Sequence, residues 1–122
     1  MSKRLIQVCA VFSLYAVPVS STAQDNAHGV TQQCLFYGTN PSICDCATDA
    51  LSQQLPTDTF AIYNDIGLLA IPLIENGADM GDAYDSAIAE TAIRRGIGYL
   101  VAMQTNNAAG QAHRDAISSC TE

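Results

Sequence analysis

Four cysteines limit the folds open to this chain more than any other feature. They are Cys34, Cys44, Cys46 and Cys120, while the fifth, Cys9, falls in a leader that the sequence predicts to be removed. A short exported chain with an even number of cysteines is typically a small domain held by disulfide bonds. Two such bonds would tie the first part of the fold to its last segment.

The first 23 residues have the organisation of a signal peptide. Lys3-Arg4 precedes an apolar run from Leu5 to Val17, and Ser21-Thr22-Ala23 supplies the small residues of a cleavage site. The apolar run is shorter than the ~20 residues that a membrane span needs. We therefore expect a signal peptide at residues 1–23 and a single domain at residues 24–122. The expected location is periplasmic or secreted, without stable membrane insertion after cleavage.

The domain that remains is strongly acidic. The whole sequence has twelve Asp and Glu residues against five Lys and Arg, which gives a formal charge of −7. Lys3 and Arg4 leave with the leader, so the mature domain keeps three strong cations and has a formal charge of −9. These cations are Arg94, Arg95 and Arg114. A surface of this sign repels phosphate backbones, so nucleic-acid binding is not expected.

The apolar pattern of the domain is helical almost throughout. Gly38 is typical of a helix end, and Asn40-Pro41 is typical of a new helix start. Residues 26–37 and 41–54 are therefore predicted to form a helical hairpin. A third helix is predicted from about residue 58 to 76, where apolar residues recur at the period of about 3.6 that marks a helix.

The last two helices are predicted with an open boundary. A fourth helix is expected to begin near Met80, and its predicted buried face consists of Ala89, Ile93, Ile97, Leu100 and Val101. Gly96 and Gly98 weaken this helix, and a break there is left open. Thr105-Asn106-Asn107 is predicted as a turn or a new cap, before a final helix that ends near Ser119. The predicted fold is all-α, a small bundle of four to five helices held by two disulfides.

The spacing of the cysteines favours one disulfide pairing. In a helical hairpin that turns near Thr39, Cys34 lies five residues before the turn and Cys44 five residues after it, so the two face each other. Cys46 lies about 200° from Cys44 around the helix axis and would reach Cys120. An error of half a turn gives Cys34–Cys46 with Cys44–Cys120 instead, so that pairing stays open. A Cys44–Cys46 bond would close a ring too tight for a regular helix.

The segment Cys44-Asp45-Cys46 also suggests two other uses of the cysteines. A redox centre needs an exposed thiol with a lowered pKa, which a helix start favours and Asp45 opposes. The same cysteines with His28 and His113 are residue types that hold zinc or copper(I), yet their spacing matches no zinc ribbon or finger. No metal or cofactor is predicted, and a thiol-redox or metal-handling protein that uses Cys44 and Cys46 is kept as an alternative.

The most polar segment of the chain runs from Thr105 to Ile117. Its candidate binding residues are Asn106, Asn107, His113 and Arg114. His113 borders the predicted buried face and is the natural candidate for an acid or base, while Arg114 is expected to pair with a neighbouring carboxylate. The chain has no nucleophile elbow and no Gly-rich phosphate loop. The sequence therefore favours a non-enzymatic module that binds a protein partner or a small ligand, with a small enzyme using His113 as a further alternative.

The two ends of the domain resemble a group of small exported bacterial proteins of uncharacterised function. These proteins share a cysteine, a spaced Cys-x-Cys pair and a closing run T-N-x-x-G-x-A-H-R-x-A-I-x-x-C. Here the closing run reads T-N-N-A-A-G-Q-A-H-R-D-A-I-S-S-C from Thr105 to Cys120, with one more residue between Asn106 and Gly110. The resemblance implies export and a helical fold, and it implies no activity.

Overall fold

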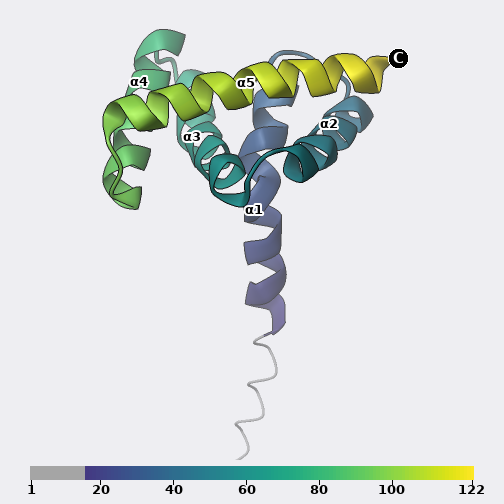
Figure 1. The fold of residues 1–122 in the computed structure, drawn as a ribbon, viewed down its shortest axis with the longest axis horizontal. Coiled ribbons are helices and arrows are strands. Elements are labelled where there is room, and N and C mark those ends of the chain that lie inside the picture. Colours follow the sequence, from purple (N-terminus) through teal and green to yellow (C-terminus); the bar gives the residue numbers. More distant parts are fainter. Residues whose placement is uncertain (1–15) are drawn as a thin grey trace, which may run out of the picture.

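The computed structural model describes the backbone of residues 16–122 and the side chains of residues 26–122, and this part of the chain forms five helices and no strand (Figure 1). The helices are α1 (Ala16–Phe36), α2 (Pro41–Gln54), α3 (Thr57–Glu75), α4 (Met80–Arg95) and α5 (Tyr99–Thr121). The predicted all-α fold with two disulfides is confirmed, with five helices rather than four. Figure 1 shows α5 running across the other helices, and it packs against α2, α3 and α4.

The first helix begins earlier than the predicted start at Asn26. Most of the predicted leader lies outside the described residues, but its last part, residues 16–23, forms the beginning of α1. Pro18 is tolerated there because backbone N–H groups in the first turn of a helix have no hydrogen-bond partner within the helix, so the N–H that proline lacks costs no bond. No further proline or glycine interrupts the chain before Gly29, so the helix continues into the domain.

Capping residues that the sequence indicates set the helix boundaries. The side chain of Asn40 accepts a hydrogen bond from the backbone N–H of Ser42 at 2.8 Å, which caps α2. Asp79 caps α4 in the same way, and it accepts from the backbone N–H of Gly81 at 3.0 Å. Gly77, between α3 and α4, has φ of 105°, in the left-handed region that glycine enters without steric cost. The Asn40 cap and the start of α4 near Met80 agree with the prediction, whereas the capping role of Asp79 was not predicted.

The turn between α4 and α5 differs from the prediction. Gly96 ends α4 with φ of 67°, and α5 begins at Tyr99 and continues without a break to Thr121. The predicted turn at Thr105-Asn106-Asn107 is therefore wrong, because these residues lie inside α5. The local turn preference of this segment is overridden by tertiary packing, since Ala102 and Ala109 on either side of it are both fully buried.

The predicted buried face of the fourth helix is wrong for three of its five residues, whereas Ala89 and Ile97 are half-buried and Ile97 packs against the core. Ile93 is 76% exposed, and Leu100 and Val101 lie beyond the end of α4 and are exposed too. The residues that α4 buries are instead mostly small: Ala83, Ala87, Ile88, Thr91 and Ala92. Small side chains allow α4 to approach its neighbours closely, and the larger isoleucine near its end faces solvent.

The core lies around α3, which contacts all four other helices. One hydrophobic cluster joins α3 to α4 and α5 and consists of Ile62, Ile66, Ala70, Ala87, Ile88, Ala92 and Ala102. A second cluster joins α3 to α1, α2 and α5 and consists of Val30, Leu51, Tyr63 and Ala109. Since α3 contributes to both clusters, the way in which α1 and α5 pack against α3 determines which side chains face one another between these helices.

Two glycines bring α1 and α3 into direct contact. A Cβ atom at Gly29 would overlap the carbonyl oxygen of Asn64, and it would lie 2.9 Å from the backbone nitrogen of Leu68. A Cβ atom at Gly67 would overlap the carbonyl oxygen of Gly29 in return. The backbone N–H of Val30 donates to Oδ1 of Asn64 at 3.0 Å across the same crossing. The two helices thus touch through their backbones, with no room for a methyl group.

Two disulfides join Cys34 to Cys44 and Cys46 to Cys120, with Cα–Cα distances of 5.6 and 6.1 Å. This is the pairing that the cysteine spacing favours. The two bonds differ in environment, because Cys34 and Cys44 are fully buried whereas Cys46 is exposed. Within residues 16–122, none of the helices combines the length and the hydropathy that a membrane span requires.

Candidate ligand pocket

The candidate binding residues of the polar segment come together in one cavity. Asn106, Asn107, His113 and Arg114 all line a pocket of about 530 Å³. They share one side of α5 because the helix runs unbroken through the segment, so Asn106, Gly110, His113 and Ile117 recur at spacings of three or four residues.

Three other parts of the chain complete the pocket. Its remaining walls come from Gln33 of α1, Tyr37 just after α1, Tyr63 of α3 and Tyr84 of α4. The sequence did not identify these four residues as site residues. These four residues lie in three separate parts of the chain. In the sequence each one is only a polar or phenolic residue within a predicted helical segment, and that alone does not indicate a site.

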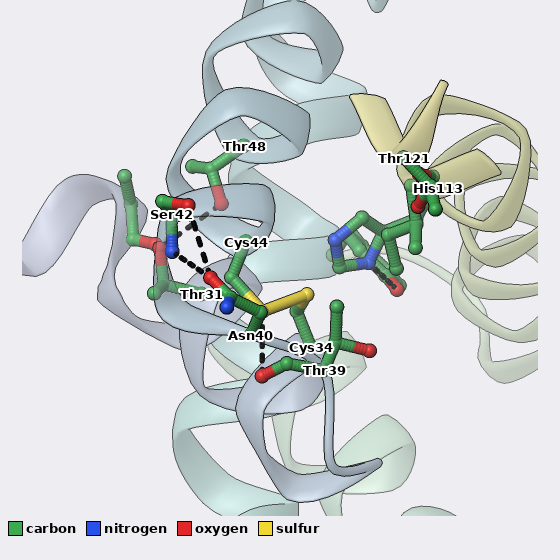
Figure 2. Close-up of a disulfide and its surroundings, with 12 residues drawn as sticks. Thr31, Cys34, Thr39, Asn40, Ser42, Cys44, Thr48, His113 and Thr121 are labelled. Atoms are coloured by element: carbon green, nitrogen blue, oxygen red, sulfur yellow. Dashed lines mark hydrogen bonds between the residues drawn. A yellow bond between two sulfur atoms is a disulfide. The ribbon is translucent and has the colours of Figure 1, made fainter. Parts of the chain in front are cut away.

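His113 lies at the inner wall of the pocket, with 3% of its surface exposed. Its Nδ1 atom is 2.8 Å from the hydroxyl of Tyr63, and the two rings meet edge to face with centroids 5.5 Å apart. Figure 2 shows the imidazole turned toward the Cys34–Cys44 disulfide. The other ring nitrogen, Nε2, is buried and has no hydrogen-bond partner among the described residues.

Burial sets the protonation of this pair. Burial, followed by the charge of Arg114, lowers the pKa of His113 from its ordinary 6.5 to about 4. Burial also raises the pKa of Tyr63 above its ordinary value. At neutral pH both side chains are therefore uncharged, and they act as hydrogen-bonding groups.

Gln33 and Tyr84 form a second polar pair in the pocket wall. The hydroxyl of Tyr84 donates to Oε1 of Gln33 at 2.8 Å, and Nε2 of Gln33 donates to the carbonyl oxygens of Gly29 and Tyr63. Burial, followed by the neighbouring Tyr37, raises the pKa of Tyr84 above its ordinary value. Because Gln33 is 2% exposed and bonded on both sides of its amide, this wall is held in a fixed position by the α1–α3 crossing.

Arg114 differs from the other two arginines of the domain. Arg94 pairs with Glu90 and Arg95 pairs with Asp65, both at 2.8 Å. The expected carboxylate partner of Arg114 is absent from residues 26–122, and its Nη2 donates instead to the neutral carboxamide of Gln111 at 2.8 Å. Among the described residues the guanidinium of Arg114 therefore forms no direct ion pair, and the carboxylate of Asp115 is bonded at 3.2 Å to the other end of the Gln111 carboxamide.

A second, larger groove of about 1090 Å³ lies on another part of the surface. It is lined by three carboxylates, Asp45, Asp49 and Asp65, together with Arg95 and the exposed His28. His28 and His113 therefore belong to different cavities, and the structure does not bring them together with the cysteines as a metal site. In the part of the chain that the structure describes, no three side chains of the metal-binding types form a group.

The Cys44-Asp45-Cys46 segment places its two cysteines in different disulfides. We expect mild thiol reductant to open Cys46–Cys120 well before Cys34–Cys44. Thiol–disulfide exchange requires access to a sulfur atom, and Cys46 is exposed whereas both Cys34 and Cys44 are buried. Timed alkylation after exposure to glutathione, followed by peptide mass spectrometry, measures the order. Opening of Cys34–Cys44 first would contradict the buried position of that bond and would favour the thiol-redox alternative.

His113 is expected to make the protein less stable in mild acid. Its pKa in the folded state, about 4, is below the unfolded value of 6.5, so only the unfolded chain binds the proton between these pH values. This contribution of His113 to the free energy of unfolding is fully present above pH 6.5 and is lost as the pH falls to about 4, in total about 3 kcal/mol. Urea unfolding between pH 7 and pH 4 should show a flatter pH dependence in His113→Gln than in the unchanged protein. Parallel curves for the two proteins would show that His113 is not held neutral.

Comparison with known protein families, with curated proteins and with solved structures found no match to this chain. The resemblance of its two ends to small exported proteins therefore stays a prediction.

Proposed function

We propose that the chain is an exported, non-enzymatic binding module whose ligand is a small molecule held in the pocket beneath α5. The observation that carries the proposal is the convergence of hydrogen-bonding side chains from α1, α3, α4 and α5 on one cavity of about 530 Å³. A concave cavity with a few well-positioned polar groups is the usual form of a small-molecule site. Two disulfides support export, since such bonds persist in oxidising compartments.

Binding is favoured over catalysis by the chemistry of the lining. The residues that line the pocket include no serine, cysteine or carboxylate that could act as a nucleophile beside His113. An imidazole with a pKa of about 4 is also a weak base at neutral pH. The same residues are well suited to recognition, because neutral donors and acceptors fixed by burial lose little entropy when a ligand binds.

Gly110 offers a direct test, because it lines the pocket and has space around it. A Cβ atom there would meet nothing closer than Arg114 Nη1 at 3.8 Å, so a larger side chain is expected to enter the cavity without displacing the backbone. We expect small polar and aromatic compounds to shift the amide signals of pocket residues in two-dimensional NMR spectra of the disulfide-bonded protein. In Gly110→Leu these shifts should be lost, with affinity at least about tenfold lower.

Gly98→Leu is the matched control. It adds the same side chain where nothing lies within 4 Å and outside the pocket lining, so binding should be unchanged. Compounds that bind Gly110→Leu as well as the unchanged protein would show that the pocket is not the binding site. A library that produces no shifts around the pocket would contradict the proposed function itself.

A further inference from the structure

The pocket has a charge opposite to that of the rest of the domain. None of the residues that line it is acidic, although twelve Asp and Glu residues occur in the sequence. By contrast, the larger groove on the same acidic domain is lined by three aspartates. The single formal charge in the pocket lining is the guanidinium of Arg114.

This guanidinium is available to an anion. In residues 26–122 its hydrogen-bonding partner is a neutral carboxamide, so a ligand carboxylate would not have to displace an internal ion pair. A planar guanidinium matches a carboxylate with two parallel hydrogen bonds, and such charge-assisted bonds are about twice as strong as neutral ones. The charge also acts on the inner wall of the pocket. Burial is the main cause that lowers the pKa of His113, and Arg114 adds to it; burial is the main cause that raises the pKa of Tyr63, and Arg114 partly opposes it.

The single positive charge of the pocket lining indicates a ligand with a single negative charge. One guanidinium compensates one negative charge, and a dianion such as a phosphate monoester would bring a second charge into a domain that already has an excess of acids. The neutral groups of the pocket, which include Tyr37, Tyr84 and Asn107, can bond to uncharged hydroxyl or carbonyl groups on the remainder of the ligand.

We propose, building on the ligand-binding role above, that the pocket selects small organic monocarboxylates and that Arg114 is the residue that binds the carboxylate. The carboxylate lies at the α5 side of the cavity, and the uncharged body of the molecule extends toward the tyrosines of α3 and α4.

The test uses acid and amide pairs of the same shape, namely benzoate with benzamide and butyrate with butyramide, together with phenyl phosphate. NMR titration of the disulfide-bonded protein at low salt should show the acids binding at least about tenfold more tightly than their amides, in keeping with a charge-assisted hydrogen bond. Arg114→Gln should remove this difference, and Arg114→Lys should restore part of it. Arg94→Gln is the control, because it removes the same charge from an arginine that pairs with Glu90 and does not line the pocket.

Two groups of results would overturn the inference in different ways. If amides or phenyl phosphate bind in the pocket as tightly as the acids, or if Arg114→Gln keeps the preference for acids, the ligand class is wrong while the binding role stands. If neither these probes nor any neutral compound shifts the signals of pocket residues, the binding role fails and the inference fails with it.

Discussion

Replacing Cys46 and Cys120 together by alanine is expected to lower the free energy of unfolding by about 4 kcal/mol. The bond closes a loop between residues 74 positions apart, and most of its effect comes from restricting the unfolded chain. Cys46 is exposed, so its removal leaves no large cavity and the measured loss reports the loop constraint. Urea unfolding should show a lower midpoint and a larger m value, since the unfolded chain expands when the link is absent.

The matched variant is the double replacement of Cys34 and Cys44 by alanine. Its loop is much shorter, with a separation of 10 residues, so the chain-entropy effect is about 2.5–3 kcal/mol and the m value should change less. Both sulfur atoms are fully buried, so an additional loss from the vacated core is expected. An unchanged m value after removal of the long link would contradict the proposed action on the unfolded state.

Gly29→Ala is expected to destabilise the domain by about 3 kcal/mol or more, a large part of the 5–15 kcal/mol that holds a typical domain folded. The new methyl group would overlap backbone atoms of α3, namely the carbonyl oxygen of Asn64 and the nitrogen of Leu68. Backbone atoms cannot move aside as the end of a side chain can, so α1 and α3 would have to separate. Thermal and urea unfolding monitored by circular dichroism measure the loss.

Gly110→Ala serves as the control for this substitution. It adds the same methyl group to a helix, but the nearest atom lies at an ordinary contact distance of 3.8 Å. Alanine has the higher helix propensity, so this variant should be more stable by about 0.5–1 kcal/mol. If both variants change stability by similar amounts, the close contact between α1 and α3 does not limit the fold.

The local features of the fold were accessible from the sequence. Asn40-Pro41 placed the start of α2 correctly, because the Asn40 side chain bonds to a nearby backbone group whatever the tertiary structure. The expected start of the fourth helix near Met80 also agrees with the structure, although the capping role of Asp79 was not predicted. The facing of Cys34 and Cys44 follows from the geometry of a helical hairpin, and the observed bond agrees with it. These predictions depend on contacts between residues that are close in the chain.

The errors arose where tertiary packing overrides local preference. A threonine and two asparagines favour a turn, yet residues 105–107 remain helical because α5 buries alanines on both sides of them. Likewise, a large apolar residue such as Ile93 suggests a core position, but α4 packs through alanines and leaves Ile93 in solvent. Composition within one helix does not indicate how close its neighbours lie.

The candidate site was predictable on one of its sides only. The polar residues of α5, including His113 and Arg114, are close together in the sequence and were identified there. Gln33 and Tyr84 come from helices whose order in space depends on the α1–α3 crossing, and neither residue has a local signal of function. The unpaired state of Arg114 is likewise a property of the folded chain, because it depends on which carboxylates other helices bring near it.

The two disulfides also determine how the folded chain transmits a pulling force. Tension applied to the two ends passes along α1 to Cys34, across the first bond to Cys44, and through one residue to Cys46, from which the second bond leads directly to Cys120. Residues 47–119 lie outside this covalent path and carry none of the load. As long as both bonds are intact, α3, α4 and nearly all of α5 are protected from mechanical extension. Under tension at both ends the pocket would therefore keep the walls that these helices supply, whereas Gln33 lies on the part of α1 that carries the load.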